Sequence, residues 1–266
     1  TKYVRCVRYC IILGKSKLKE EKMPRIEIVF LWFITYSIFG WVYETILCSI
    51  KKKRFINRGF LNGPYCPIYG CGAVLDILLL GKIHNTVLLF FTAALLTGGL
   101  EYITSVIMEK LFHARWWDYS DKKFNIHGRV YLTGIIVFGT LSVVLILFLH
   151  PAVSSIIARL SATMRSALVV SFFLILLIDV IYTITKFLEF GKILQDLGNR
   201  LEVPIQSTKT RCVSVFTTIN EGTKTINSQI RRMILAFPNL KSIRFGEELK
   251  RLRELLQSGK NGKYIR

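Results

Sequence analysis

The sequence lacks the short motifs that mark most enzymes and metal sites. Its six cysteines form no CxxC pair and have no zinc-type spacing with the four histidines, so we expect free thiols and no metal site. It contains no nucleophile elbow and no HExxH motif. It also has no GxxxxGK(S/T) loop, so the chain cannot bind and hydrolyse ATP in P-loop fashion. We therefore expect neither enzyme activity nor a cofactor.

Acidic residues are scarce as well. The chain has 17 Asp and Glu residues against 37 Lys and Arg, which gives a net charge of +20 at pH 7. A charge of this size is compatible with a nucleic-acid partner, but no RNA- or DNA-binding motif is present. The basic residues instead flank apolar segments, so the lipid bilayer and its anionic headgroups explain their placement better.

Long hydrophobic runs, in contrast, are abundant. Hydrophobic residues make up 52% of the chain, and the mean hydropathy is +0.41. We predict an all-α membrane protein, a polytopic bundle of about five transmembrane helices. The expected spans are at about residues 27–50, 64–80, 83–108, 130–149 and 166–186. The second is short, so we expect it to tilt or to start inside a protein-lined cavity, and the fourth is expected to end at His150-Pro151.

We divide the chain into three parts. Residues 1–25 form a basic N-terminal arm, residues 26–186 the transmembrane domain, and residues 187–266 a basic helical tail. Residues 1–22 precede Met23, and we expect them to be either a non-native extension or a disordered arm. They lack the apolar core and the cleavage site of a secretory signal.

The tail has a helical pattern of its own. Its apolar residues recur at spacings of four, three and four, starting with Phe190, Leu194, Leu197 and Leu201. This spacing is typical of amphipathic helices with a coiled-coil-like seam. The tail either lies against anionic lipid or self-associates through the seam, and the pattern favours neither alternative.

The distribution of Lys and Arg predicts which loops face the cytoplasm. Loops 51–63 and 109–129 together hold ten of these residues, whereas loops 81–86 and 150–165 hold three. The positive-inside rule places the first pair of loops and the tail in the cytoplasm, with the N-terminus outside. We expect a multi-pass protein of the cell membrane.

The segment NRGFLNGPYCPIYG, residues 57–70, is unusually rich in special residues. Glycines allow close approach or positive φ, prolines fix φ, and polar side chains can donate or accept hydrogen bonds. These residues are Asn57, Gly59, Asn62, Gly63, Pro64, Tyr65, Pro67, Tyr69 and Gly70. The segment is either a membrane-entry loop that ends in a proline-started helix, or a shaped polar site at the membrane boundary.

A second polar and aromatic stretch lies between residues 109 and 129. Its aromatic residues are of the type found at membrane interfaces, but polar residues interleave with them. The residues that we single out are Trp116, Trp117, Asp118, Tyr119, Asn125 and Gly128.

Four carboxylates interrupt the apolar blocks. Glu44 and Glu101 lie at similar depths, and such groups are costly in a membrane unless they have partners, so we predict a buried polar cluster around them. Asp76 and Asp179 are weaker candidates, since little around them in the sequence is polar. The other expected members of the cluster are Arg58, Arg115, Arg129, Tyr43, Tyr65 and Tyr69. The cluster is either a structural ion-pair network or the lining of a cavity that opens to the cytoplasm.

Three stretches together carry a family resemblance: FGWVYET (39–45), NRGFLNGPYCPIYG (57–70) and LEYITSVIMEKLFHARWWDYSDKKFNIHGR (100–129). They resemble the bacterial family named "Putative ABC-transporter type IV", or CmpB-like. The resemblance implies a transporter permease that moves a small solute or lipid with a separate ATPase subunit. The alternative hypothesis is a non-transport membrane scaffold or lipid-binding protein whose helical tail recruits partners.

Overall fold

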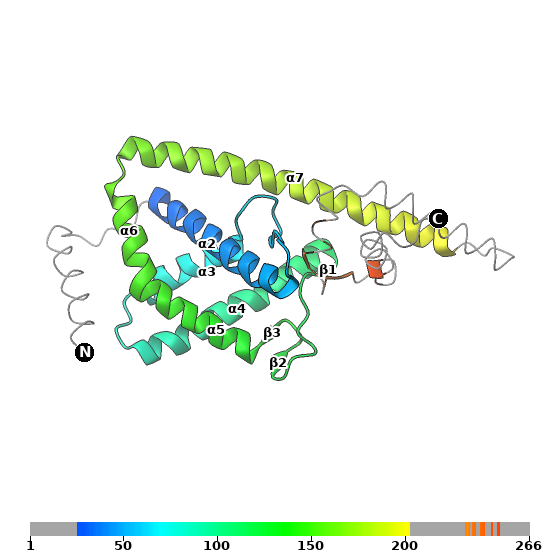
Figure 1. Ribbon diagram of the computed structural model, residues 1–266, viewed down its shortest axis with the longest axis horizontal. Helices are drawn as coiled ribbons and strands as arrows, with labels where there is room; N and C mark the ends of the chain where they lie inside the picture. Colours follow the sequence, from blue (N-terminus) through cyan, green and yellow to red (C-terminus); the bar gives the residue numbers. More distant parts are fainter. Residues whose placement is uncertain are drawn as a thin grey trace.

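Figure 1 shows a computed structural model of the protein, in which residues 26–202 and a set of tail residues between 232 and 250 are described. The described tail residues are Arg232, Ile234, Ala236, Phe237, Leu240, Lys241, Ser242, Gly246, Leu249 and Lys250. The side chains of residues 190–202 are not described. The expected N-terminal arm and most of the predicted tail helices, with their coiled-coil seam, lie outside the described residues.

The described part of the chain is mostly helical, as predicted. Its elements are α2 (Ile26–Lys52), α3 (Pro67–Leu75), the π-helix η2 (Asp76–Leu80), α4 (Thr86–Phe112), β1 (Ala114–Arg115), β2 (Asn125–Ile126), β3 (Val130–Tyr131), α5 (Leu132–Val144), the π-helix η3 (Leu145–Leu149), α6 (His150–Arg159), α7 (Ala162–Glu202) and β4 (Lys241–Ser242).

Four helices in the described residues are long and apolar enough to cross a membrane, where the sequence predicted about five. They are Ile26–Lys52, Thr86–Phe112, Leu132–Arg159 and Ala162–Glu189. The second predicted span forms a shorter apolar helix, Pro67–Leu80. Its first residues were expected to be helical from Pro64, but the helix begins only at Pro67, because the chain before it is an extended loop that packs against other helices.

The sequence predicted that the fourth span ends at His150-Pro151, but the helix continues beyond these residues. The π-turn of η3 bonds the backbone N–H of His150 to the carbonyl of Leu145, five residues earlier. Pro151 then occupies the first turn of α6, where its missing N–H leaves no helical hydrogen bond unmade. The helix therefore bends and continues to Arg159 (Figure 1).

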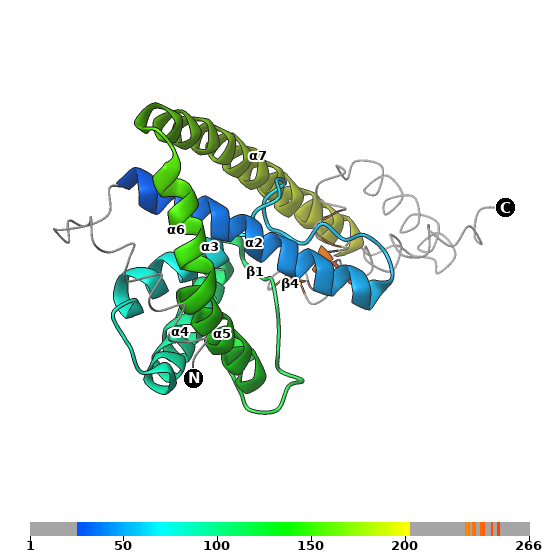
Figure 2. The ribbon, with the colours of Figure 1, turned by 60° about the vertical axis from the view of Figure 1, so that its left-hand side comes forward.

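Helix α7 is also longer than expected. It runs without a break from Ala162 to Glu202, so residue 187, the proposed start of the tail, lies inside it. It runs along α2, as Figures 1 and 2 both show. The separability of the tail from the transmembrane domain stays a prediction.

The closest helix packing joins α2 with α3 and α4 with α5. Between α2 and α3, Gly40 lies against the Tyr69 ring, and Gly70 lies against the Ser37 hydroxyl and the Phe33 carbonyl. A Cβ at either glycine would be closer than 3.0 Å to these atoms. These two glycines therefore set how closely the helices approach.

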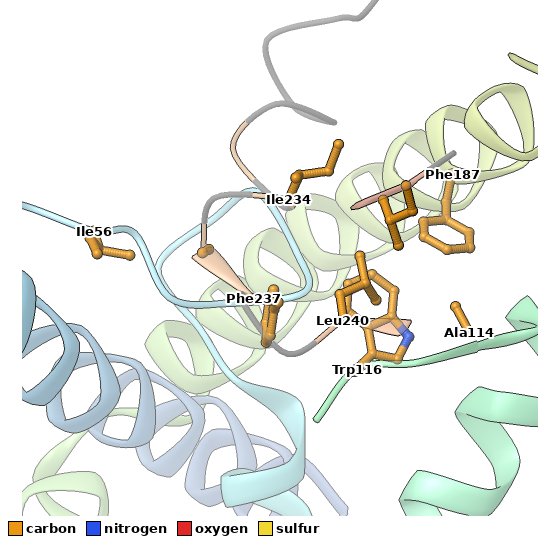
Figure 3. Packing of buried hydrophobic residues seen from close by; sticks show 9 residues of the cluster. Ile56, Ala114, Trp116, Phe187, Ile234, Phe237 and Leu240 are labelled. Atoms are coloured by element: carbon orange, nitrogen blue, oxygen red, sulfur yellow. The ribbon is translucent and has the colours of Figure 1, made fainter. Parts of the chain in front are cut away.

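One end of the bundle has its own apolar core (Figure 3). The loop after α2, the segment around β1, helix α7 and the described tail all contribute to it. Its buried residues are Ile56, Ala114, Trp116, Phe187, Ile234, Ala236, Phe237, Leu240 and Leu249. Strand β4 of the tail pairs with β1 in the antiparallel direction. The two basic loops thus share one end of the molecule, as the charge pattern predicts, and the assignment of this end to the cytoplasm stays a prediction.

Candidate functional site

Residues 53–66, which we call the re-entrant segment, turn back from the end of α2 and run along it as non-helical chain. One face of α2 presents hydrogen-bonding groups at four-residue spacing, which is close to one helical turn. The Ser49 hydroxyl accepts from the Ile56 amide (3.0 Å), the Thr45 hydroxyl accepts from the Arg58 amide (3.4 Å), the Trp41 indole donates to the Asn57 side chain (2.7 Å), and the Ser37 carbonyl accepts from the Cys66 amide (2.9 Å).

These four hydrogen bonds hold the segment against α2 over much of the length of that helix. Ser37 precedes Lys52 by 15 residues, a distance of roughly 20 Å along the helix axis at 1.5 Å per residue. Non-helical backbone at membrane depth is tolerated only where protein groups or water satisfy it. The segment therefore needs partners on its other sides as well.

Asp179 of α7 supplies partners for the amides of the segment. Its carboxylate accepts hydrogen bonds from the backbone N–H of Asn62 (3.0 Å) and Gly63 (2.7 Å). It also accepts from the hydroxyls of Tyr65 (2.7 Å) and Thr183 (3.1 Å). Burial and this carboxylate raise the pKa of Tyr65, so its hydroxyl remains a donor. The sequence analysis ranked Asp179 low because little around it in the sequence is polar. Its loop partners lie more than 110 residues away, and the local signal of Thr183, one turn along α7, was missed.

Two arginines complete the surroundings of the re-entrant segment. The guanidinium of Arg232, in the tail, donates to the carbonyls of Gly59 (3.2 Å) and Leu61 (2.9 Å) and, at longer range, to those of Asn57 and Phe60. Arg58, in the re-entrant segment, donates in the opposite direction to the carbonyl of Ala236 in the tail. Its guanidinium carbon lies 4.3 Å from the centroid of the Phe237 ring. No local sequence pattern indicates this role of Arg232, because its partners are backbone atoms.

Glu44 lies beside this segment, and the structure brings three of the predicted cluster residues together there. The Tyr69 hydroxyl donates to one carboxylate oxygen of Glu44 at 2.6 Å, and the Arg58 Nε lies 3.5 Å from the other. The ring of Tyr43 packs 6.2 Å from that of Tyr69. The side chains of Arg58 and Glu44 are 22% and 28% exposed, so the pair is open to the outside of the bundle.

Glu101 does not pair with the arginines proposed for it. Arg129 lies 2.8 Å and Arg115 3.0 Å from Glu109 instead, two turns further along α4. Glu109 lies nearer the end of the helix, where the long arginine side chains keep contact with the polar surroundings. One oxygen of Glu101 is hydrogen-bonded by Tyr119, and the other has no partner in the described residues. Burial raises the pKa of Tyr119, which keeps its hydroxyl a donor.

The second polar stretch folds into a hairpin of β2 and β3. Asp118 accepts from the amide and hydroxyl of Ser120, and Asn125 accepts from the amide of Gly128 at 2.9 Å. Gly128 has a φ of +67°, and a Cβ there would meet the Asp118 carboxylate. The Trp117 indole donates to the Arg129 carbonyl, while Trp116 lies in the apolar core of Figure 3. These contacts shape the loop.

The remaining residues of the 57–70 motif are distributed over these contacts. Asn57 joins Trp41 to the carbonyl of Asn62 (3.3 Å), and Pro67 opens α3. Across residues 26–189 and the described tail positions, no group of three or more His, Cys, Asp or Glu side chains is arranged to hold a metal ion.

Comparison with known proteins assigns a family. The model of the family described as "Putative ABC-transporter type IV" matches residues 31–184, which is more than half of the chain. The chain belongs to this family. Searches of curated proteins and of solved structures gave no match.

The ABC-transporter-related family and the four membrane-length helices identify a membrane protein. The region matched by the family model holds the re-entrant segment, the hairpin and all four intramembrane carboxylates: Glu44, Asp76, Glu101 and Asp179. Arg232 and β4 lie beyond it.

Proposed function

We propose that this protein is a permease-like subunit of the cell membrane that moves a small solute or lipid and is driven by a separate ATPase subunit. In this proposal the chain does not hydrolyse ATP itself, because it carries no phosphate-binding loop. The observation that carries the proposal is the re-entrant segment, which holds non-helical backbone at membrane depth beside intramembrane carboxylates.

This arrangement suits transport better than a purely structural role. A stable bundle needs only apolar helices, whereas non-helical backbone and ionisable groups inside a membrane are costly. Discontinuous segments of this type line the substrate sites of many transporters. The partly exposed pair of Glu44 and Arg58 offers both signs of charge to a polar group entering from the loop end.

The hairpin of β2 and β3 is the candidate contact for an ATPase subunit. The loop that leads into this hairpin is exposed and carries Asp121, Lys122 and Lys123. Its base is fixed by the hydrogen bonds of Asp118 and Asn125 and by the stacking of Tyr119 on Tyr131 at 4.6 Å. Because this base is rigid, movement of a partner docked on the charged residues is transmitted to Tyr119. Tyr119 passes it to Glu101 through their hydrogen bond.

The test is affinity purification of the full chain from crosslinked native membranes. We expect a nucleotide-binding subunit in the eluate, and we expect the double variant Lys122→Glu, Lys123→Glu to lose it while remaining folded and in the membrane. The double variant Lys51→Glu, Lys52→Glu is the matched control, since it changes the same charge at the end of α2. An eluate with no nucleotide-binding subunit from the wild-type chain would overturn the proposal.

A lipid-binding or scaffold role is the second candidate, and one observation favours it. Phe124, directly before β2, and Ile126, in β2, are 78% and 51% exposed and follow the two lysines in the sequence. Apolar side chains next to basic ones are typical of surfaces that insert into an anionic lipid interface. Under this alternative, the crosslinked eluate contains membrane assembly factors and no ATPase.

A further inference from the structure

Asp76 and Glu101 share an arrangement that distinguishes them from the other intramembrane carboxylates. They are 1% and 7% exposed. Each is hydrogen-bonded by one hydroxyl group, which belongs to Ser142 for Asp76 and to Tyr119 for Glu101. In each, the second oxygen is buried and has no hydrogen-bond partner among the residues that the structure describes.

Three other carboxylates in the described helices are compensated. Asp179 accepts four hydrogen bonds, Glu109 is paired with two arginines, and Glu44 has Arg58 and Tyr69. An ionised carboxylate that is buried without such partners loses its hydration and gains little in return. A protonated carboxyl group carries no charge, so it avoids this cost.

Among the described residues, the groups that interact with each carboxyl group include no cation. Glu101 interacts with Tyr119 and with Glu44, whose negative charge disfavours a second one nearby. Arg129, which the sequence assigned to Glu101, lies 2.8 Å from Glu109 and donates to the Ser105 hydroxyl at 3.0 Å. Asp76 interacts with Ser142 across the contact between η2 and α5.

The two sites lie at different depths in the bundle, Asp76 near one end and Glu101 near the middle of α4. Asp76 opens η2, four residues before Leu80 and the turn that leads to α4. Glu101 precedes Phe112, at the end of α4 nearest the hairpin, by 11 residues, or about 16 Å along the axis. Asp and Glu side chains spaced through a membrane protein in this way are typical of proton-binding groups.

We propose that Asp76 and Glu101 are two proton-binding sites, both protonated in the resting protein and both able to exchange their proton with water. In each exchange the carboxyl O–H bond breaks, the proton passes to a water molecule and the carboxylate remains until another proton returns. The inference goes beyond the proposed transport function, which requires no proton, and neither depends on the other.

Infrared spectroscopy of the full chain in lipid nanodiscs tests the proposal. We expect the carbonyl stretch of protonated carboxyl groups at neutral pH, shifted to lower frequency after transfer to D2O. Asp76→Asn and Glu101→Gln should each remove about half of this band. Glu109→Gln is the matched control and should leave the band unchanged, since Glu109 is held as an ion by two arginines.

Three results would overturn the inference. The wild-type band could be absent at neutral pH, it could persist unchanged in both Asp76→Asn and Glu101→Gln, or it could fail to shift in D2O. The first and third concern the wild-type chain alone, so a variant that does not fold leaves the test intact.

Discussion

Asp179 lies within an apolar helix, yet its carboxylate accepts four hydrogen bonds. Two of the donors are backbone amides of the re-entrant segment, and two are the hydroxyls of Tyr65 and Thr183. Hydrogen bonds to the charged form stabilise the carboxylate, and Arg232 also interacts with it electrostatically. One side chain thus fixes the turn at Asn62-Gly63 to α7.

Removal of this carboxylate should be far more damaging than removal of one of its donors. Asp179→Ala leaves two backbone amides without a partner at membrane depth, and we expect a loss of about 3 kcal/mol in the free energy of unfolding. Tyr65→Phe removes one hydrogen bond and should cost about 1 kcal/mol. Both are measured by denaturation of the purified protein in detergent.

Thr185→Ala is the control for these variants. Thr185 is exposed on the same helix, and its hydroxyl bonds only to the Ile181 carbonyl one turn earlier. A loss for Asp179→Ala no larger than that of Thr185→Ala would show that Asp179 does not anchor the segment.

Among the elements, α2 organises the loop end of the molecule. Its polar groups at positions 37, 41, 45 and 49 hold the re-entrant segment, while Gly40 and Ser37 lie against α3. The helix therefore packs against a second helix and a non-helical chain at once. This requires close contact with α3, which its glycines and those of α3 allow.

A methyl group at this contact should separate the two helices. A Cβ at Gly70 would lie 2.2 Å from the Ser37 hydroxyl and 2.4 Å from the backbone carbonyl of Phe33. Since backbone cannot rotate away, we expect Gly70→Ala to destabilise the protein by about 2 kcal/mol. The shift in thermal unfolding temperature measures this effect.

Gly99→Ala is the matched control, because nothing lies within 4 Å of a Cβ at that position in the middle of α4. We expect it to be neutral or slightly stabilising, since alanine is the better helix former. Equal effects of the two substitutions would contradict the close packing of α2 and α3.

The sequence predicts these helices well and their irregular partners poorly. Hydrophobic runs locate four membrane-length helices because burial in lipid depends on local composition. The sequence predicted a helix end at Pro151 and missed the continuation of the helix. A π-turn before the proline preserves the helix there. The partners of the re-entrant segment were missed because Asp179 and Arg232 contact it over more than 110 and 170 residues of sequence.

The candidate site shows the same division. Glu44, Arg58 and Tyr69 lie close together in the sequence, and the structure places them in contact. Arg115 and Arg129 were assigned to Glu101 from depth alone, whereas they contact Glu109, on the same helix. Depth along a helix is readable from the sequence, but the direction in which a long side chain turns is not.

At the scale of the whole molecule, the two basic loops, the hairpin and the described tail residues gather at one end. The apolar core around Trp116 and Phe237 and the pairing of β1 with β4 join them (Figure 3). The turns after η2 and after α6 lie at the other end (Figure 1). Our account of transport depends on which side of the membrane this loop end faces, because an ATPase subunit acts from the cytoplasm.

Cysteine accessibility tests this central claim most directly. A single cysteine is placed at Lys122, an exposed position of the hairpin, in a chain whose six native cysteines are replaced by serine or alanine. A second single cysteine at His84, in the turn before α4, serves as the control for the opposite end. The account predicts that a membrane-impermeant maleimide labels the His84→Cys variant in intact cells and labels the Lys122→Cys variant only after the cells are opened. Labelling of Lys122→Cys in intact cells would place the hairpin outside and contradict the account.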